Sequence, residues 1–177
     1  MVIVGLMWNW MYNPMFGLIN NLKQTLFPGS PAFDWLQKTG NIIYFLTIAA
    51  SWGYTGICMI MFITGLQTIP AELYEAAAID GANKWQQFRF ITVPQLMGTI
   101  NIVIIYTLIN SFKVFDVVVV MTGGGPGRAT NVLATWAYTQ MFTYHEIGKG
   151  CATAWVLTVI VFLLSSVYQK LNAPREN

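Results

Sequence analysis

Long apolar runs alternate with polar connections along the chain, and three of these runs are long enough to cross a membrane. They cover roughly residues 41–66, 94–120 and 147–168. A helix needs about 20 apolar residues to span the hydrocarbon core, and a somewhat longer run is accommodated by tilting. The pattern therefore predicts an all-α, polytopic membrane helix bundle with about three full spans.

The first twelve residues are also apolar, but they are too few for a complete span. They lack the basic stretch and the small-residue cleavage site of a signal peptide. We interpret them as a partial N-terminal span whose earlier part lies upstream of Met1. On this interpretation, residues 1–177 form a single transmembrane domain.

Two connections differ in character. Residues 13–40 are rich in Gly, Pro and Asn and predict a loop, in which Phe33 and Trp35 suit a membrane interface. Residues 67–93 instead combine charged side chains with helix-forming alanines. That combination predicts helices that lie in water, outside the bilayer.

The last connection begins with a glycine-rich stretch. Residues 121–131 read MTGGGPGRATN, which predicts a turn. The polar and aromatic residues 131–145 follow and predict a short interfacial helix.

Composition agrees with a membrane protein and speaks against a nucleic-acid-binding protein and against a cysteine metal site. The chain is 55% hydrophobic and 9% charged, and its mean hydropathy is +0.54. A net charge of only +2 gives no basic stripe for nucleic acid. Cys58 and Cys151 stand inside apolar runs without metal-site spacing, so we interpret them as small core residues.

Basic residues do not orient the chain. The cytoplasmic side of a membrane protein normally carries the excess of Lys and Arg. If the charged segment and the C-terminus share one side, the two sides are nearly balanced. The residues compared are Lys84, Arg89, Lys170 and Arg175 on one side, and Lys23, Lys38 and Arg128 on the other, with Lys113 and Lys149 near the boundary.

The charged segment predicts a helix–turn–helix. Pro70 suits the first position of a helix that runs to about residue 79, and acidic residues near its start complement the helix dipole. Gly81 can adopt the left-handed conformation of a helix C-terminus, and a second short helix can follow over residues 83–91. Pro94 is then expected to open the next span. The acidic residues are Glu72 and Glu75.

The same segment resembles the signature of ABC-importer permeases, which reads EAA, three residues, Gly, nine residues, Ile, one residue, Leu, Pro. The matching residues are Glu75, Ala76, Ala77, Gly81, Ile91 and Pro94, with Val93 in place of the usual Leu. The surrounding ELY and Asp80-Gly81-Ala82 look like the carbohydrate-uptake branch, typified by the maltose transporter. The resemblance implies that Glu75, Ala76, Ala77, Asp80, Gly81 and Pro94 couple the chain to an ATPase.

Other stretches extend this resemblance over nearly the whole chain. Residues 115–131 are similar to the external loop of sugar permeases, and the opening residues resemble the external loop that follows the third of six spans. The resemblance implies that residues 67–94 are a cytoplasmic loop and that the first two spans and most of the third are absent. It also implies an external role for Gly123, Gly124, Gly125 and Pro126.

The resemblance further implies a set of partners. They are a second permease subunit, two cytoplasmic ATPase subunits that bind the ATP, and an extracytoplasmic solute-binding protein. We expect no cofactor in this chain and no nucleic acid. The localisation implied is the bacterial inner membrane.

Catalytic patterns are not evident in the sequence. The glycine run is not a phosphate-binding loop, because no Lys-Ser or Lys-Thr follows Gly127. His145, the only histidine, stands beside Glu146 at an expected membrane boundary, without a nucleophile or a metal-ligand cluster. We therefore do not expect an enzyme.

Polar residues within the spans suggest a path for a solute. On a helix with 3.6 residues per turn, one side of the run after the signature carries Gln95, Thr99, Tyr106, Asn110 and Lys113. The preceding span carries a weaker stripe of Thr47, Ser51, Tyr54 and Cys58. Such residues line a cavity or join helices by hydrogen bonds, and the sequence leaves both interpretations open.

These patterns lead to one main hypothesis and two alternatives. The main hypothesis is the permease subunit of an ABC importer for a sugar or a related polyol, whose hydroxyls would suit Asn, Thr and Tyr. One alternative is an ion-coupled transporter, for which only Lys113 and Asp116 approach the required intramembrane charges. The other is a permease fragment that does not function.

Overall fold

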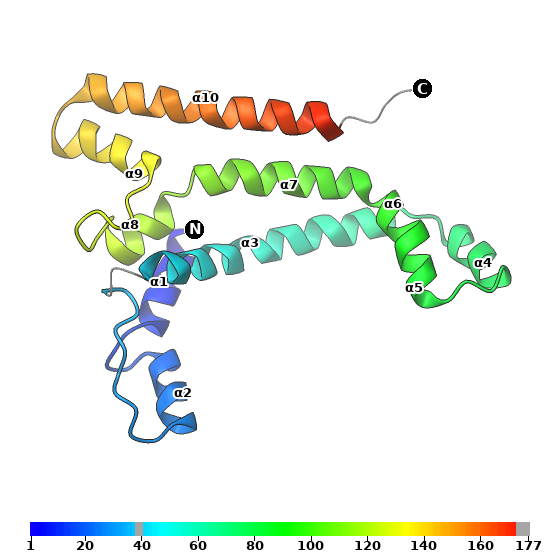
Figure 1. The fold of residues 1–177 in the computed structure, drawn as a ribbon, viewed down its shortest axis with the longest axis horizontal. Coiled ribbons are helices and arrows are strands. Elements are labelled where there is room, and N and C mark those ends of the chain that lie inside the picture. The colour runs from blue at the N-terminus through cyan, green and yellow to red at the C-terminus, as the bar shows by residue number, and fades with distance from the viewer. Residues whose placement is uncertain (38–40, 173–177) are drawn as a thin grey trace. The chain divides into compact units, whose positions relative to one another are not determined.

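The computed structural model describes residues 1–37 and 41–172, and these residues form helices joined by turns, with no strand among them (Figure 1). The elements are α1 (Val2–Met11), α2 (Leu18–Leu26), α3 (Ile42–Gln67), α4 (Ala71–Ile79), α5 (Lys84–Gln87), the π-helix η1 (Phe88–Thr92), α6 (Val93–Gln95), α7 (Met97–Phe112), α8 (Asp116–Thr122), α9 (Leu133–Tyr138), the π-helix η2 (Thr139–Thr143) and α10 (Ile147–Asn172). The all-α prediction is confirmed.

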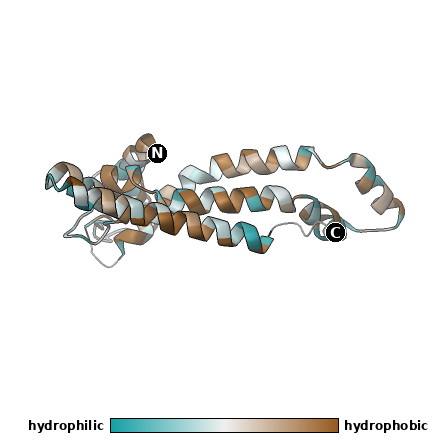
Figure 2. Ribbon diagram, turned by 90° about the horizontal axis from the view of Figure 1, so that it is seen from above, coloured by the Kyte–Doolittle hydropathy of each residue, from teal (hydrophilic) through white to brown (hydrophobic). Residues whose placement is uncertain are grey.

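Two of the predicted spans are single long helices. α3 and α10 each contain 26 residues, which is about 39 Å at 1.5 Å per residue and enough to cross a bilayer. Both are long and apolar enough to cross a membrane. Figure 2 shows hydrophobic residues along the long helices.

The third predicted span, over residues 94–120, is wrong as one continuous helix. α7 begins only at Met97 and ends at Phe112, and α8 follows as a separate short helix. Before α7, the helical stretch Lys84–Gln95 meets it at an angle of 64°. The described residues thus contain two helices able to cross a membrane, or three if this bent pair counts as one span.

The bend has a local cause. Pro94 has no N–H and its ring crowds the carbonyl four residues earlier, so an α-helix cannot pass through it undisturbed. The chain winds as a π-helix immediately before, where the Val93 N–H donates to the Phe88 carbonyl five residues back. The helix then ends at Leu96, and Pro94 therefore lies inside a helical stretch instead of opening the span.

The connection over residues 13–40 contains the helix α2, so the prediction of a loop is only partly correct. Asn20, which is 2% exposed, organises this region. Its side-chain oxygen accepts from the Phe33 N–H at 3.2 Å and from the Trp35 indole at 3.1 Å. Trp35 also packs against the rings of Tyr12 and Phe45, which makes it a packing residue as well as a candidate for the membrane interface.

The chain divides into two compact units. One comprises Met1–Gly53 and Asn110–Leu164, and the other comprises Tyr54–Ile109 and the residues from Ser165 onward. The first unit has a buried core of Tyr12, Leu46, Ala49, Val117 and Met121. Within it α1 packs closely on α8, because a Cβ on Gly5 would lie 3.1 Å from Val120 Cγ1.

The second unit joins helices that are distant in sequence. Gly65 of α3 is buried against Leu96 and Thr99, and the Tyr168 hydroxyl of α10 donates to Asn101 Oδ1 of α7 at 3.1 Å.

The single transmembrane domain remains a prediction. Of the basic residues compared for orientation, Lys38 and Arg175 lie outside the described residues.

Candidate functional site

The signature segment, residues 67–94, forms the predicted helix–turn–helix, and its first helix is α4. Pro70 is the N-cap, with extended backbone (φ −60°, ψ 133°), and not the first helical residue as the sequence suggested. The placement is still favourable because a proline there removes only a donor that would lack a partner in the helix. Glu72 lies in the first turn, where its charge complements the helix dipole.

Gly81 ends α4 in the left-handed conformation that the sequence predicts, with φ +79°. The Gly81 N–H donates to the Ala78 carbonyl at 3.1 Å, and the Ala82 N–H donates to the Ala77 carbonyl at 2.9 Å. These two bonds form a Schellman motif, which closes the helix and reverses the chain. A residue with a Cβ would be strained at this φ.

α5 begins with a capping box. The Asn83 side chain accepts from the Gln86 N–H at 2.9 Å, and the Gln86 side chain accepts from the Asn83 N–H at 2.8 Å. The Asn-x-x-Gln spacing is readable in the sequence, since it pairs two otherwise unbonded donors. Gln87 adds a bond from its amide to the Ala82 carbonyl at 3.3 Å.

One side-chain contact joins α4 to the π-helix η1 within the signature segment. The hydroxyls of Tyr74 in α4 and Thr92 in η1 lie 2.9 Å apart. Thr92 is buried, so the contact is shielded from water. Sequence reasoning missed this pair, because nothing in the spacing of two residues 18 positions apart indicates a contact.

The outer surface of α4 is open. Glu75, Ala76, Asp80 and Gly81 are exposed, and Ala77 is half-buried. Pro94 is exposed as well. Two apolar side chains on the same helix also face outward, since Leu73 is 37% and Ile79 is 87% exposed. Ile79 thus adds an exposed apolar side chain to the helix that carries the exposed Glu75 carboxylate.

The structure brings together only part of the polar stripe predicted after the signature. Gln95 lies in α6, beyond the 64° bend, and Lys113 lies past the end of α7. The assumption of one straight helix was therefore wrong for these two residues. Thr99, Tyr106 and Asn110 remain on α7.

The two predicted stripes meet at one point. The rings of Tyr54 and Tyr106 lie edge to face, with centroids 6.3 Å apart. Thr99 instead contacts α3, because a Cβ on Gly65 would collide with the Thr99 hydroxyl. On α3, Thr47 and Ser51 are exposed, and the Thr47 hydroxyl donates to the Ile43 carbonyl at 2.8 Å.

The remaining member of that stripe, Cys58, is a free and partly buried thiol. The other cysteine, Cys151, is free and exposed on α10. Its exposure corrects the expectation that both cysteines pack in the interior.

The glycine-rich segment is a turn held by threonines. Gly123 caps α8 with φ +60°, and Gly124 has φ +89°. Thr130, which is 1% exposed, donates to the Gly125 carbonyl at 2.9 Å and contacts the Thr122 hydroxyl at 2.8 Å. Gly125 joins Pro126 through a cis peptide bond.

The segment after this turn is helical, as predicted, and consists of α9 and η2. Sequence reasoning did not identify the polar pocket that this segment forms with the start of α10. Its charged and aromatic members are separated by up to 21 positions, from Arg128 to Lys149, so no short motif marks them.

Comparison with known proteins decides the family. Residues 1–175 match the family described as "Binding-protein-dependent transport system inner membrane component". The chain belongs to this family. Membership of this family agrees with the apolar helices of the chain. It also assigns the chain to the inner membrane.

Curated relatives give the same result. This family member is 36% identical over 170 residues to a probable ABC transporter permease protein of Bacillus subtilis, which covers 96% of the chain and 58% of the relative. It is 34% identical over 176 residues to a trehalose/maltose transport system permease protein of Thermococcus litoralis, which covers 99% of the chain and 59% of the relative. The chain therefore spans less than two thirds of the length of these relatives.

A solved structure has the same fold. A chain in the crystal structure of a bacterial ABC transporter that imports the acidic polysaccharide alginate aligns with a TM-score of 0.87. The alignment covers 99% of this family member and 61% of that chain, at 20% identity. At this identity the likeness describes the fold alone.

Proposed function

We propose that this chain is part of the permease subunit of an ABC importer for a saccharide or a related polyol, and that α4 couples it to a cytoplasmic ATPase. The observation that carries the proposal is the rigid helix–turn–helix between two apolar helices, with Glu75 exposed on α4 and Gly81 reversing the chain. The family membership and the names of the sugar-transporting relatives support it.

The signature segment is suited to transmit force because its internal bonds make it one rigid piece. The Schellman motif at Gly81, the capping box at Asn83 and the contact between Tyr74 and Thr92 fix it internally. Its outward surface combines the Glu75 carboxylate with the apolar Ile79. A cleft in an ATPase subunit with a basic and an apolar wall would complement this surface.

The proposed solute path uses the polar residues of α3 and α7. Tyr54 and Tyr106 offer hydroxyls and aromatic faces, and Ser51 and Asn110 add hydrogen-bonding groups. Thr99 and Lys113, which the sequence also assigned to the path, lie respectively against Gly65 and beyond α7. We therefore place the main contribution at Tyr106 and Asn110.

The proposed assembly contains a second permease subunit, two ATPase subunits that bind ATP, and an extracytoplasmic binding protein. The chain itself provides no enzymatic step in this proposal. With the signature segment on the cytoplasmic side, the turn at residues 123–126 and the start of α10 lie on the external side, where Gly123, Gly124, Gly125 and Pro126 would face the binding protein.

The coupling role is tested by changing α4 in the complete importer. Glu75→Lys should loosen the ATPase and abolish uptake, because losing one partner of a desolvated charge pair typically costs about 2 to 5 kcal/mol. Gly81→Asp should have the same effect, because a Cβ is strained at φ +79°. The measurements are co-purification of the ATPase and uptake of radiolabelled saccharide by cells.

Glu72→Gln and Glu75→Gln form a matched pair. Both residues are exposed on α4, one turn apart, and the amide removes the charge without placing a cation in the first turn of the helix. Glu72→Gln should retain the ATPase and most of the uptake, whereas Glu75→Gln should lower both. Normal association and uptake in both Glu75→Lys and Gly81→Asp would remove α4 from the mechanism.

A further inference from the structure

A polar pocket lies where α9, η2 and the first turns of α10 meet, within one compact unit of the chain. Its volume of about 720 Å³ falls in the range of about 300 to 1,000 Å³ that is usual for ligand sites. The lining combines charged, amide and aromatic side chains, namely Arg128, Trp136, Gln140, Tyr144, Glu146 and Lys149.

The walls of this pocket are held by tight backbone packing. Gly150 of α10 is buried against Met141, and a Cβ there would lie 2.9 Å from the Ala137 carbonyl oxygen. The corner between η2 and α10 is turned by His145, a non-glycine residue with φ +58°. The Glu146 N–H then donates to the Gln140 carbonyl at 2.8 Å. Left-handed residues and π-helical turns are both found preferentially at functional sites.

Gln140 gives the pocket an unused acceptor. The residue is 5% exposed, and its Oε1 atom has no hydrogen-bond partner in the described part of the chain. A buried polar atom without a partner is costly and rare. Oε1 itself has less than 1 Å² of exposed surface, so it meets a ligand only when the Gln140 side chain turns toward the pocket that it lines, and a hydrogen bond from the ligand would then remove this cost.

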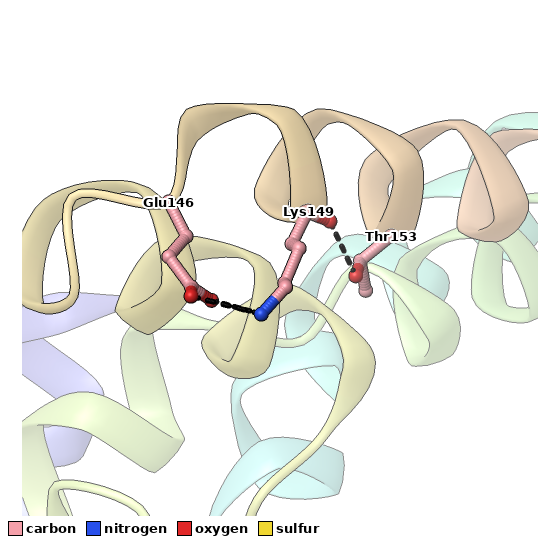
Figure 3. Close-up of polar contacts among 3 residues, drawn as sticks. All are labelled: Glu146, Lys149 and Thr153. Carbon is pink, nitrogen blue, oxygen red and sulfur yellow. Dashed lines mark hydrogen bonds and ion pairs between the residues drawn. The ribbon is translucent and has the colours of Figure 1, made fainter.

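Charges of both signs line the same pocket as Gln140. Figure 3 shows the side chains of Glu146 and Lys149 pointing toward each other, with the Lys149 ammonium 2.8 Å from the carboxylate. In the same view the Thr153 hydroxyl donates to the Lys149 carbonyl at 2.9 Å, which leaves its oxygen available as an acceptor. The Arg128 guanidinium lies over the Trp136 ring, 4.9 Å from its centroid.

This combination selects the chemistry of the ligand. Glu146 is paired with Lys149, so with Arg128 the lining has a net charge of +1 (two cations and one anion), which disfavours a cationic ligand. Hydroxyl groups both donate and accept, so they can use Gln140 Oε1 together with Lys149. The exposed part of the Tyr144 ring offers an apolar surface for sugar C–H groups.

We propose that this pocket is an external saccharide-binding subsite, which holds one sugar unit near the entrance of the path. Its placement on the external side rests on the proposed function, because that function puts the signature segment in the cytoplasm and the start of α10 on the opposite side. The subsite shares no residue with the polar residues proposed for the path on α3 and α7.

The test measures protection of a cysteine in the pocket. Thr153→Cys is introduced into the complete importer in nanodiscs, without Cys58 and Cys151 and without the binding protein, and its labelling by a polar thiol reagent is followed. Maltose, trehalose and alginate oligosaccharide are the probes. At about a tenfold excess over Kd, a bound saccharide should slow labelling about tenfold, because only the free fraction reacts.

Matched variants show whether saccharide bound in the pocket causes the slower labelling of Thr153→Cys. Thr143→Cys, an exposed residue of η2 outside the lining, should label at the same rate with or without saccharide. Gln140→Met should abolish protection of Thr153→Cys. Lys149→Met should weaken it without endangering the fold, because that side chain is 70% exposed.

The possible outcomes separate this proposal from the proposed function. If all three saccharides fail to slow labelling, or if only phosphate or only the binding protein does so, the subsite is overturned. Uptake is measured with the same preparations after adding the binding protein. Uptake without protection overturns the subsite alone. Normal ATPase association and normal uptake in both Glu75→Lys and Gly81→Asp would instead overturn the proposed coupling function.

Discussion

Two glycines at the start of α10 show how residue surroundings determine tolerance. Gly148 has no atom within 4 Å of a built Cβ, whereas Gly150 is buried against Met141 and the Ala137 carbonyl. They are two positions apart in one helix, so their backbone preferences are the same. Only the packing differs.

This difference makes a prediction. Gly150→Ala should lower the Tm of the purified importer, because forcing a methyl group into a packed contact typically costs about 1 to 3 kcal/mol. Gly148→Ala should leave Tm unchanged or raise it, since alanine favours a helix by about 0.5 to 1 kcal/mol over glycine. Equal shifts in differential scanning fluorimetry would show that α10 does not pack there as described.

At the scale of elements, a small residue brings α3 and α7 together. Gly65 is buried on α3, and a Cβ there would lie 3.0 Å from Leu96 Cδ2 and would collide with Thr99. Small residues allow close approach of helices in membranes, where packing replaces the hydrophobic effect. The contact supports the interpretation that Thr99 packs between helices, although the sequence also allowed it to line the solute path.

We expect Gly65→Ala to separate the two helices and reduce transport. The matched control is Gly56→Ala, on the same helix, where no atom lies within 4 Å of a built Cβ. Rates of uptake and the yield of assembled importer should fall for the first variant and stay near normal for the second. Normal uptake by Gly65→Ala, with an unchanged yield, would contradict the close contact between α3 and α7.

At the scale of the whole molecule, the proposed path makes a prediction for Tyr106 and Asn110. Cysteine at either position, in a complete importer without Cys58 and Cys151, should react with a small polar thiol reagent. Polar side chains in spans normally face an aqueous cavity or another helix and not lipid. Resistance of both positions in the outward and the inward states would place the path elsewhere.

The sequence by itself determined the features that depend on local chemistry. The helices α3 and α10, at about 39 Å, are longer than the hydrocarbon core of a bilayer, which is about 30 Å thick, so the length of their apolar runs predicts helical spans. Gly81 was predictable because only glycine adopts φ +79° without strain. The signature spacing led to the family by the same local information.

Tertiary structure decided what the residues of those runs contact. The bend at Leu96 is a separate case, because its cause at Pro94 is local, but hydropathy averages over residues 94–120 and does not register it. The contact of Tyr74 with Thr92 and the pocket around Gln140 join residues far apart in sequence. Such contacts depend on how helices pack, and the periodicity of a single helix contains no information about its neighbours.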